Sequence, residues 1–347
     1  MIDLRSDTLT MPDEAMLQTI LTAPLGDDGR TNEDGRGEDE TINKLEDFAS
    51  SLVGKESGVL LPTGTMGNTV AMFAHCKRGD KVLVERKNHV YVSEKIAFDA
   101  DFGGITPVFY DLDDSLMPDL NSMEKLLQSE DIKLIWLENS HNFSAGAYID
   151  VDRMKAIQEL SKRYNVPIHM DGARLFHVAA ALKVDVKEIT QYVDTVMFCL
   201  SKGLGAPVGS LLCGSESFIL EARKIRKLFG GTTRQGGIIA APGLYALQHN
   251  VDRLVEDVEN AKLVAQRINN NLNKIKLVGK PQTNIVILDT LDAGIKADEF
   301  CKRARSKGLL VRPVLNDHLV RLVFYKGISE DDALKTAEII LDIDSEL

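Results

Sequence analysis

Apolar runs rich in branched residues alternate with amphipathic segments over residues 58–212. This alternation is typical of an α/β domain with a largely buried parallel sheet. Seven runs are expected to be strands: residues 59–62, 81–85, 106–110, 133–138, 167–170, 195–200 and 209–213. Helical stretches between them, such as residues 68–76 and 151–164, would serve as crossovers. The pattern therefore predicts a mostly parallel, seven-stranded sheet flanked by helices.

The pattern changes after a glycine-rich segment at residues 230–237. One long helical pattern covers residues 238–272 and would bridge two domains. Shorter segments follow, read as strands at 284–288, 309–313 and 319–324 and as helices at 297–307 and 330–341. They describe a smaller α+β layer. We therefore expect an N-terminal segment and large domain over residues 1–250, and a small C-terminal domain over residues 251–347.

Composition and charge narrow the class of partner. The chain has 347 residues, of which 44% are apolar and 27% charged, so we expect a compact globular protein. Its formal net charge of −11 argues against nucleic acid, because phosphate backbones are bound by clustered lysine and arginine. No apolar run approaches the length of a membrane span. A small-molecule partner is therefore expected, with no nucleic acid and no membrane.

The cysteines and the first residues bear on location. Cys76, Cys199, Cys213 and Cys301 lie far apart and form no Cys-x-x-Cys pair, so neither a metal site nor a disulfide framework is predicted. Residues 1–5 show no basic segment followed by an apolar one, the pattern of a secretory signal. A reducing cytoplasm is the expected location.

Three predicted strands end in residues that carry chemistry. In open α/β sheets, ligands bind beyond the carboxyl ends of the strands. Residues 63–68 follow the first strand and open a helix, whose free N–H groups would hold a phosphate. Asp171 and Arg174 follow the fifth strand, and Lys202 follows the sixth among small residues.

Each of these features has an ordinary structural explanation when it is taken alone. A plain strand–helix connection explains the Gly- and Thr-containing turn about as well as a phosphate site does. A helix N-cap explains Asp171. Together they supply a lysine for a Schiff base, an acid for a pyridinium nitrogen and a cup for a phosphate. These are the three items that pyridoxal 5'-phosphate (PLP) binding requires.

The sequence resembles the threonine aldolase family of PLP-dependent enzymes, which have the aspartate-aminotransferase fold (fold type I). The resemblance extends over nearly the whole chain. It is carried, in the order of the family, by residues 4–8, 62–68, 138–142, 171–174, 200–210 and 234–235. The segment around Ser201 and Lys202 is the most specific of these.

The resemblance implies roles in cofactor binding. Lys202 would form the Schiff base, and Asp171 would keep the pyridine nitrogen protonated so that the ring accepts electrons. His89 would stack on the ring. Four further positions match the family's phosphate-binding residues: Gly64, Thr65, Lys227 and Arg234. The last two reach the phosphate from a neighbouring subunit in the family, so a homodimer or homotetramer with shared active sites is implied.

The resemblance also implies how an amino acid substrate would be bound. Ser6, Arg174 and Arg321 match the residues that hold its carboxylate, which a guanidinium can bind with two parallel hydrogen bonds. His141 matches a second histidine near the substrate hydroxyl. Either His89 or His141 would serve as the base, because an imidazole titrates near neutral pH.

One segment departs from the family. Residues 29–41 are longer, highly charged and lack the tyrosine that the family places near the active site across the dimer interface. A reshaped substrate entrance and a solvated surface loop explain this segment about equally well. Arg30 and Arg36 would face the site in the first case and pair with nearby acids in the second.

The expected activity is the retro-aldol cleavage of threonine or allo-threonine to glycine and an aldehyde. Two alternatives stay open at this point. One is β-elimination from another amino acid by a PLP enzyme of the same fold. The other is a non-catalytic, regulatory module that binds PLP or a nucleotide, although residues 63–68 lack the Gly-x-Gly-x-x-Gly spacing of dinucleotide binders.

Overall fold

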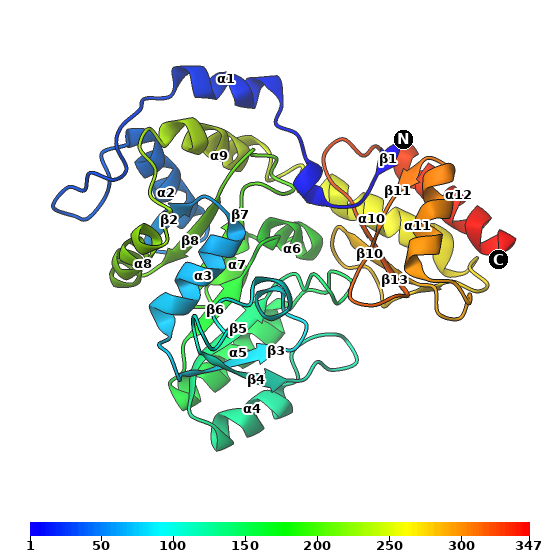
Figure 1. Cartoon of the computed structure of the whole chain (residues 1–347), viewed down its shortest axis with the longest axis horizontal. Coiled ribbons are helices and arrows are strands. Elements are labelled where there is room, and N and C mark those ends of the chain that lie inside the picture. Colours follow the sequence, from blue (N-terminus) through cyan, green and yellow to red (C-terminus); the bar gives the residue numbers. More distant parts are fainter.

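A central seven-stranded sheet organises the larger part of the molecule (Figure 1). The computed structural model describes residues 1–347. Across the sheet the strands are β2 (Ser57–Leu61), β8 (Ser210–Gly214), β7 (Thr195–Cys199), β6 (Ile168–Asp171), β5 (Ile132–Glu138), β3 (Lys81–Glu85) and β4 (Thr106–Tyr110). β8 runs in the direction opposite to the other six strands. The predicted mostly parallel seven-stranded sheet is confirmed.

Alternate residues of each strand enter two separate cores. Leu83 packs into a cluster on one face of the sheet, while Val82 and Val84 pack into a cluster on the other. Such strands are apolar on both sides because helices cover both faces. The first face is covered by α2 (Glu40–Leu52), α4 (Leu120–Ser129), α5 (Val151–Tyr164), α6 (Leu175–Leu182), α7 (Val186–Thr190) and α9 (Gly237–His249). The second is covered by α3 (Gly64–His75) and α8 (Glu216–Leu228).

Helix α3 begins four residues earlier than the apolar pattern indicates, because Thr63 caps it. The Oγ1 atom of Thr63 accepts a hydrogen bond from the N–H of Met66 at 3.1 Å. An N-cap of this kind satisfies one of the free N–H groups of the first turn. The helix therefore starts at Gly64, directly beside the end of β2.

The remaining elements form a smaller lobe, on the right of Figure 1, which holds both termini. Its antiparallel sheet has the order β12 (Arg312–Pro313), β13 (Leu319–Val323), β10 (Ile285–Asp289) and β9 (Lys276–Leu277). The helices are α10 (Leu254–Asn269), α11 (Ala297–Ser306) and α12 (Glu330–Glu346). The first strand, β1 (Ile2–Asp3), pairs with β11 (Leu309–Leu310), so Ile2 and Leu4 pack into the core of this lobe. The short α1 (Glu14–Thr22) then crosses to the large lobe and packs against α9.

Two element predictions are wrong in detail. The single helix expected over residues 238–272 is broken into α9 and α10. At the break, the side-chain amide of Asn250 donates to the Leu204 carbonyl at 2.7 Å, a tertiary contact that fixes the turn. The strand expected over residues 309–313 is divided between β11, which pairs with β1, and β12, which pairs with β13.

The two hydrophobic cores meet along α10. Leu254 belongs to the large-lobe core, whereas Ala261, Val264 and Ile268 belong to the core of the small lobe. The boundary between a large and a small domain near residue 250 stays a prediction. None of the helices combines the length and the apolar character that a membrane span requires.

Candidate active site

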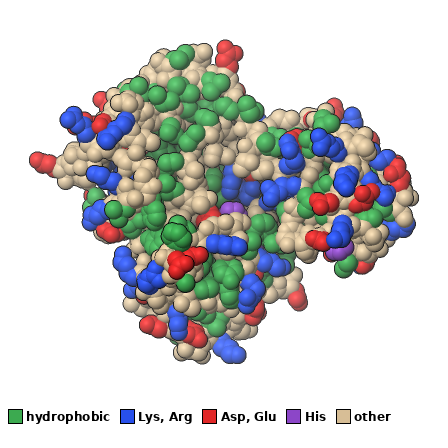
Figure 2. Space-filling model, in the orientation of Figure 1, with side chains coloured by type: hydrophobic (Ala, Val, Ile, Leu, Met, Phe, Trp, Pro, Cys, Tyr) green, Lys and Arg blue, Asp and Glu red, His purple; other side chains and the backbone are tan.

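A cavity of about 370 Å³ lies where the two lobes meet, and only four of its 21 lining residues are hydrophobic. Lysine and arginine side chains gather around this hollow (Figure 2). The carboxyl ends of β2, β3, β5, β6 and β7 and the segments that follow them form one side, which we call the strand-end wall. Arg312 on β12 and Arg321 on β13 form the other, which we call the small-domain wall.

Asp171 is the last residue of β6 and is 2% exposed. Its Oδ2 atom accepts a hydrogen bond from Asn68 Nδ2 at 2.8 Å, and its Oδ1 atom accepts one from the Ala173 N–H at 3.0 Å. An ionised carboxylate has about four acceptor positions, so these two bonds fix the side chain and leave it able to accept a further N–H.

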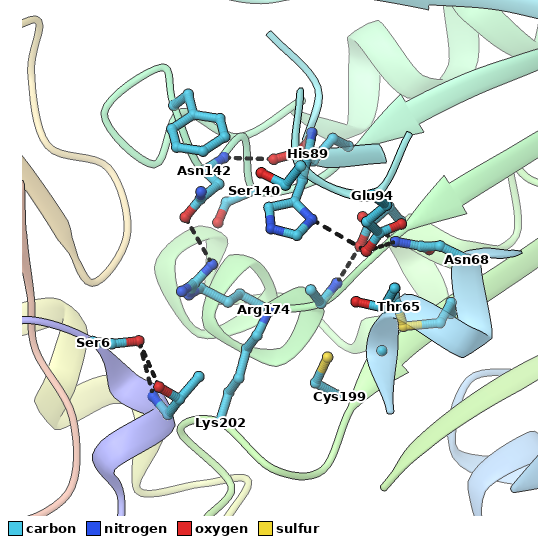
Figure 3. A pocket seen from close by; sticks show the side chains of 18 of the residues that line it. Ser6, Thr65, Asn68, His89, Glu94, Ser140, Asn142, Arg174, Cys199 and Lys202 are labelled. Atoms are coloured by element: carbon cyan, nitrogen blue, oxygen red, sulfur yellow. Dashed lines mark hydrogen bonds and ion pairs between the residues drawn. The ribbon is translucent and has the colours of Figure 1, made fainter. Parts of the chain in front are cut away.

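Lys202 follows β7 on a loop that returns directly to β8. The Gly209 carbonyl accepts from the N–H groups of Leu200 and Ser201, which closes the loop, and Gly209 itself has a φ of 114° that favours glycine. The Lys202 side chain extends into the cavity between Arg174 and Cys199 (Figure 3). It forms no ion pair, so its amine is available for covalent chemistry.

The N-terminus of α3 opens into the same cavity. Gly64 and Thr65, the first two helical residues, both line it, and their N–H groups have no partner within the helix. A Cβ atom at Gly64 would lie 2.7 Å from Cys199 Sγ, so only glycine allows this close approach. The result is a polar, dipole-favoured position for a phosphate.

His89 also lines the cavity, at the start of the short π-helical turn η2 (Val90–Glu94). Its Nδ1 atom lies 3.2 Å from Glu94 Oε1, and 36% of its side chain is exposed. Burial opposes protonation, but the hydrogen bond and charge of Glu94, together with the charges of Asp171 and Glu138, outweigh burial and raise the pKa of His89. Glu138 fixes the backbone here, since its Oε2 atom accepts from the His89 N–H at 2.5 Å.

His141 lies outside the cavity. It is 4% exposed, and its Nε2 atom lies 2.8 Å from Glu85 Oε2 behind the end of β3. Its Nδ1 atom is buried without a hydrogen-bond partner and lies 4.0 Å from Glu138 Oε1. Burial lowers the pKa of His141, but the charges of Glu138 and Glu85 raise it by more. The pKa of His141 is therefore raised overall. The structure therefore does not bring this predicted base into contact with the cavity.

The residues expected to hold a carboxylate lie together. Arg174 donates from Nε and Nη2 to Asp7, at 2.7 and 2.8 Å, and from Nη1 to Asn142 Oδ1 at 3.2 Å. Arg321 donates from Nη1 to the same Asn142 oxygen at 2.7 Å. Ser6 lines the cavity nearby as the N-cap of the 3₁₀ turn η1 (Asp7–Leu9). Two guanidinium groups thus converge on one acceptor oxygen beside the site.

Lys227 and Arg234 lie away from the cavity of this chain and are both exposed. Arg234 forms an ion pair with Asp27 at 3.1 Å. The charged segment at residues 29–41 projects from the large lobe, at the left of Figure 1, and neither Arg30 nor Arg36 lines the cavity.

Several cavity residues were not predicted from the sequence. Asn68, Glu138 and Asn142 lie within the motifs that carried the resemblance, so their positions were visible although their roles were not. Glu94 follows His89 at a spacing of five, which only the π-helical turn makes meaningful. Arg312 has no local signal, because it reaches the cavity through the pairing of β12 with β13.

The residues present fit PLP. Lys202 would hold it covalently, Asp171 would pair with its pyridine nitrogen, and the N-terminus of α3 would bind its phosphate. Asn68 Oδ1 and Glu94 Oε2 are buried without partners beside this space, as expected where a polar ligand completes the site. The fold and the site thus define a PLP-dependent enzyme of fold type I.

Comparison with known proteins gives the family. The sequence model of the beta-eliminating lyase family matches residues 3–292. The chain is 38% identical over 343 residues to the low specificity L-threonine aldolase of Escherichia coli, with 97% of each chain covered. It is 36% identical over 341 residues to low-specificity L-threonine aldolase 1 of Arabidopsis thaliana, covering 95% of this chain and 93% of the relative. The chain belongs to the beta-eliminating lyase family.

Solved structures agree on the fold. A threonine aldolase of Leishmania major superposes with a TM-score of 0.79 at 15% identity, over 99% of both chains. A putative L-allo-threonine aldolase of Listeria monocytogenes superposes with a TM-score of 0.75 at 20% identity, over 95% of this chain and 99% of that one. The predicted PLP fold type I is confirmed.

Proposed function

We propose that the protein is a PLP-dependent aldehyde-lyase that cleaves threonine or allo-threonine to glycine and acetaldehyde. The observation that carries this proposal is one cavity that brings together Lys202, Asp171, His89 and the Arg174–Arg321 pair. In that order, these residues would supply a covalent anchor for the cofactor, a carboxylate for the pyridine nitrogen, a base, and a binding site for the substrate carboxylate. The identity to low-specificity L-threonine aldolases over nearly the whole chain supports it.

The side chains divide the reaction between them. Arg321 and Arg174 would hold the substrate carboxylate, with Ser6 as a further donor, and so fix which bond at Cα lies toward the base. His89 Nε2 would take the proton of the β-hydroxyl while Glu94 holds the ring through Nδ1. When bound, PLP accepts the electron pair that the broken Cα–Cβ bond leaves at Cα.

We favour His89 over His141 as the base. His89 is the histidine that lines the cavity, and its raised pKa makes its neutral form a stronger proton acceptor. His141 is instead a buried neighbour of Glu85 and Asn88. Its role would be to position the end of β3 and the segment that leads to His89.

Product analysis tests the proposed reaction. Incubation with the four threonine stereoisomers should release acetaldehyde and glycine in equal amounts from at least one of them. Release of ammonia and a 2-oxo acid would contradict the proposal and support β-elimination. A protein that binds PLP, turns yellow and converts none of these substrates would support a regulatory role instead.

We also propose that two subunits share their active sites. Lys227 and Arg234, which would contact the phosphate of a neighbour, are exposed here. Leu228 and Phe229, which follow Lys227 directly, are exposed apolar side chains. Leu17 and Leu21 on α1 and Ile238 on α9, two helices that pack together, are exposed as well. An exposed apolar surface beside Lys227, which forms no ion pair, and Arg234, whose Asp27 partner is also accessible at the surface, suits a second copy of the chain.

Mixing two inactive variants tests the shared site. Lys202→Ala and Arg234→Ala should each lose activity, and some mixed dimers should recover it because one of their sites keeps both residues. No recovery after proven subunit exchange would mean that each site is built within one chain.

We further propose a cytoplasmic location. The four free thiols and the lack of a disulfide are consistent with it.

A further inference from the structure

Arg312 is a second guanidinium on the small-domain wall that the proposed reaction does not use. It lies on β12 directly opposite Arg321 on β13, as Cα partners of an antiparallel pair. Directly opposite residues point to the same face of a sheet. Both side chains line the cavity. The wall therefore presents two adjacent positive charges to whatever binds there.

No carboxylate of the protein neutralises this pair. Neither Arg312 nor Arg321 forms an ion pair, whereas the two carboxylate oxygens of Asp7 are taken up by Arg174. Arg321 is only 5% exposed, and its Nε atom is buried without a hydrogen-bond partner. Burial, and then the charges of Arg174 and Arg312, lower the pKa of Arg321, and the opposing charge of Asp7 offsets only part of this effect.

The acids that line the cavity are committed elsewhere. Glu94 pairs with His89, and Glu138 accepts from the backbone N–H groups of His89 and Asn142. Asp171 is reserved for the cofactor. Like charges directly opposite one another in a sheet are destabilising, so a bound anion is needed to offset the Arg312–Arg321 pair. One substrate carboxylate supplies one negative charge, and a second charge remains to be matched.

We propose that this wall binds a second acidic group, so that the site accepts β-hydroxy-α-amino acids whose side chain ends in a carboxylate. The simplest is 3-hydroxyaspartate. Arg321, with Arg174, would hold the α-carboxylate, and Arg312 would bind the side-chain carboxylate with its planar fork of donors. This inference rests on the proposed function, since it names a substrate class for the same site.

The reaction balances without any further reactant. The bond between Cα and Cβ breaks, and the β-hydroxyl loses its proton to the base as its oxygen becomes the aldehyde carbonyl. The electron pair left at Cα is finally quenched by a proton. 3-Hydroxyaspartate thus gives glycine and glyoxylate, and its neutral analogue 3-hydroxyasparagine gives glycine and the amide of glyoxylate.

These two substrates have nearly the same shape and differ in one charge, so they form a matched pair. Wild-type holoenzyme should show a higher kcat/KM for 3-hydroxyaspartate than for 3-hydroxyasparagine of the same configuration. Arg312→Met should lower the ratio of the two values about tenfold or more, the scale of one hydrogen bond to a charged group. Arg312→Lys should give an intermediate ratio, and Arg305→Met, an exposed arginine on α11, should leave it unchanged.

Two results would overturn the inference: no preference for the acidic substrate in wild type, or an unchanged ratio in Arg312→Met, whether both kcat/KM values stay intact or both fall by the same factor. An equal fall in both values would mean that Arg312 binds the α-carboxylate that every substrate has. Affinity for L-aspartate and L-asparagine, measured by calorimetry, gives a second readout because neither has the hydroxyl needed for cleavage. Loss of the aspartate preference in Arg312→Met, without cleavage of any hydroxy amino acid by wild type, would sustain this inference and refute the proposed reaction.

Discussion

The two walls of the cavity differ in whether the protein itself supplies partners for their charged side chains. On the strand-end wall, His89 is paired with Glu94, and Asp171 is fixed by the amide of Asn68. On the small-domain wall, Arg312 and Arg321 face the same space without any acid. Such a contrast indicates that the first wall is organised before a ligand arrives, whereas the second is completed by the ligand's own negative charge.

The origin of each wall in the fold explains this difference. The strand-end wall stands on parallel strands that are buried on both faces, so its carboxylates have hydrogen-bond donors within the protein. The small-domain wall stands on a short antiparallel pair at the edge of the smaller sheet, with Arg312 exposed. A charge with access to water tolerates the lack of a partner, and its site stays open to a substrate.

The largest effect should follow the loss of Lys202, the residue without which the strand-end wall cannot hold its cofactor. Lys202→Ala should lose the visible absorbance of the Schiff base and reduce turnover to background. Absorbance spectra and acetaldehyde release measure the two effects. Lys224→Ala, a surface lysine paired only with Glu221, is the control and should remain yellow and active. A yellow, active Lys202→Ala protein would remove this lysine from the mechanism.

The next effect concerns Asp7, which gives Arg174 the partner that Arg312 and Arg321 lack. The Asp7–Arg174 pair is almost fully buried. Burial alone would raise the pKa of Asp7, but the charge and hydrogen bonds of Arg174 lower it overall. Asp7→Ala should reduce the free energy of unfolding by about 3–5 kcal/mol, because it leaves a buried guanidinium uncompensated. Urea titration measures this change.

Asp3→Ala is the matched control for Asp7. It removes a carboxylate whose partner, Arg5, is half exposed. Because exposed ion pairs contribute less than about 1 kcal/mol, this variant should change stability little. Equal changes in the free energy of unfolding for the two substitutions would show that the buried pair contributes no more to stability than the exposed one. The contrast between paired and unpaired arginines would then not be reflected in stability.

A smaller effect should appear in the pH profile. His89 must be neutral to accept a proton, so kcat/KM should fall as the pH drops below its raised pKa. Glu94→Gln removes the carboxylate that raises this pKa, and the acid limb should therefore move to lower pH. The profile of kcat/KM for threonine from acid to neutral pH measures the shift. An acid limb that stays in place would show that His89 does not govern it.

The strand-end wall could be predicted from the sequence because each of its parts is local. Gly64, Asp171 and Lys202 each follow a recognisable apolar strand directly, and parallel strands carry such residues to one edge of the sheet. The histidines show the limit of this reasoning. Both His89 and His141 follow strands, yet only the contacts of the folded chain turn one into the cavity and the other toward Glu85.

The small-domain wall could be predicted only in part. Arg321 matched a family position, but Arg312 depends on the register between β12 and β13, which no local pattern specifies. The break between α9 and α10 was missed for a similar reason, since it depends on the contact of Asn250 with a loop far away in sequence. Where a residue acts through long-range pairing, periodicity and motifs carry no signal.

The smallest effect is expected at Arg36, an arginine with partners at the surface. Its Nη1 atom pairs with Asp47 at 2.8 Å, and its Nη2 atom donates to the Asn43 carbonyl at 3.0 Å. Because Asp47 and the Asn43 carbonyl engage both of its Nη atoms, Arg36 should not recruit a substrate as we infer for Arg312. The double variant Arg30→Ala/Arg36→Ala should change the free energy of unfolding by less than about 1 kcal/mol. Its KM values for 3-hydroxyaspartate and threonine should equal those of wild type. A rise in KM for the acidic substrate alone would mean that the projecting segment supplies a substrate cation, most directly to the site of a neighbouring subunit. The arginine that selects acidic substrates would then have to be sought in this segment as well as on β12.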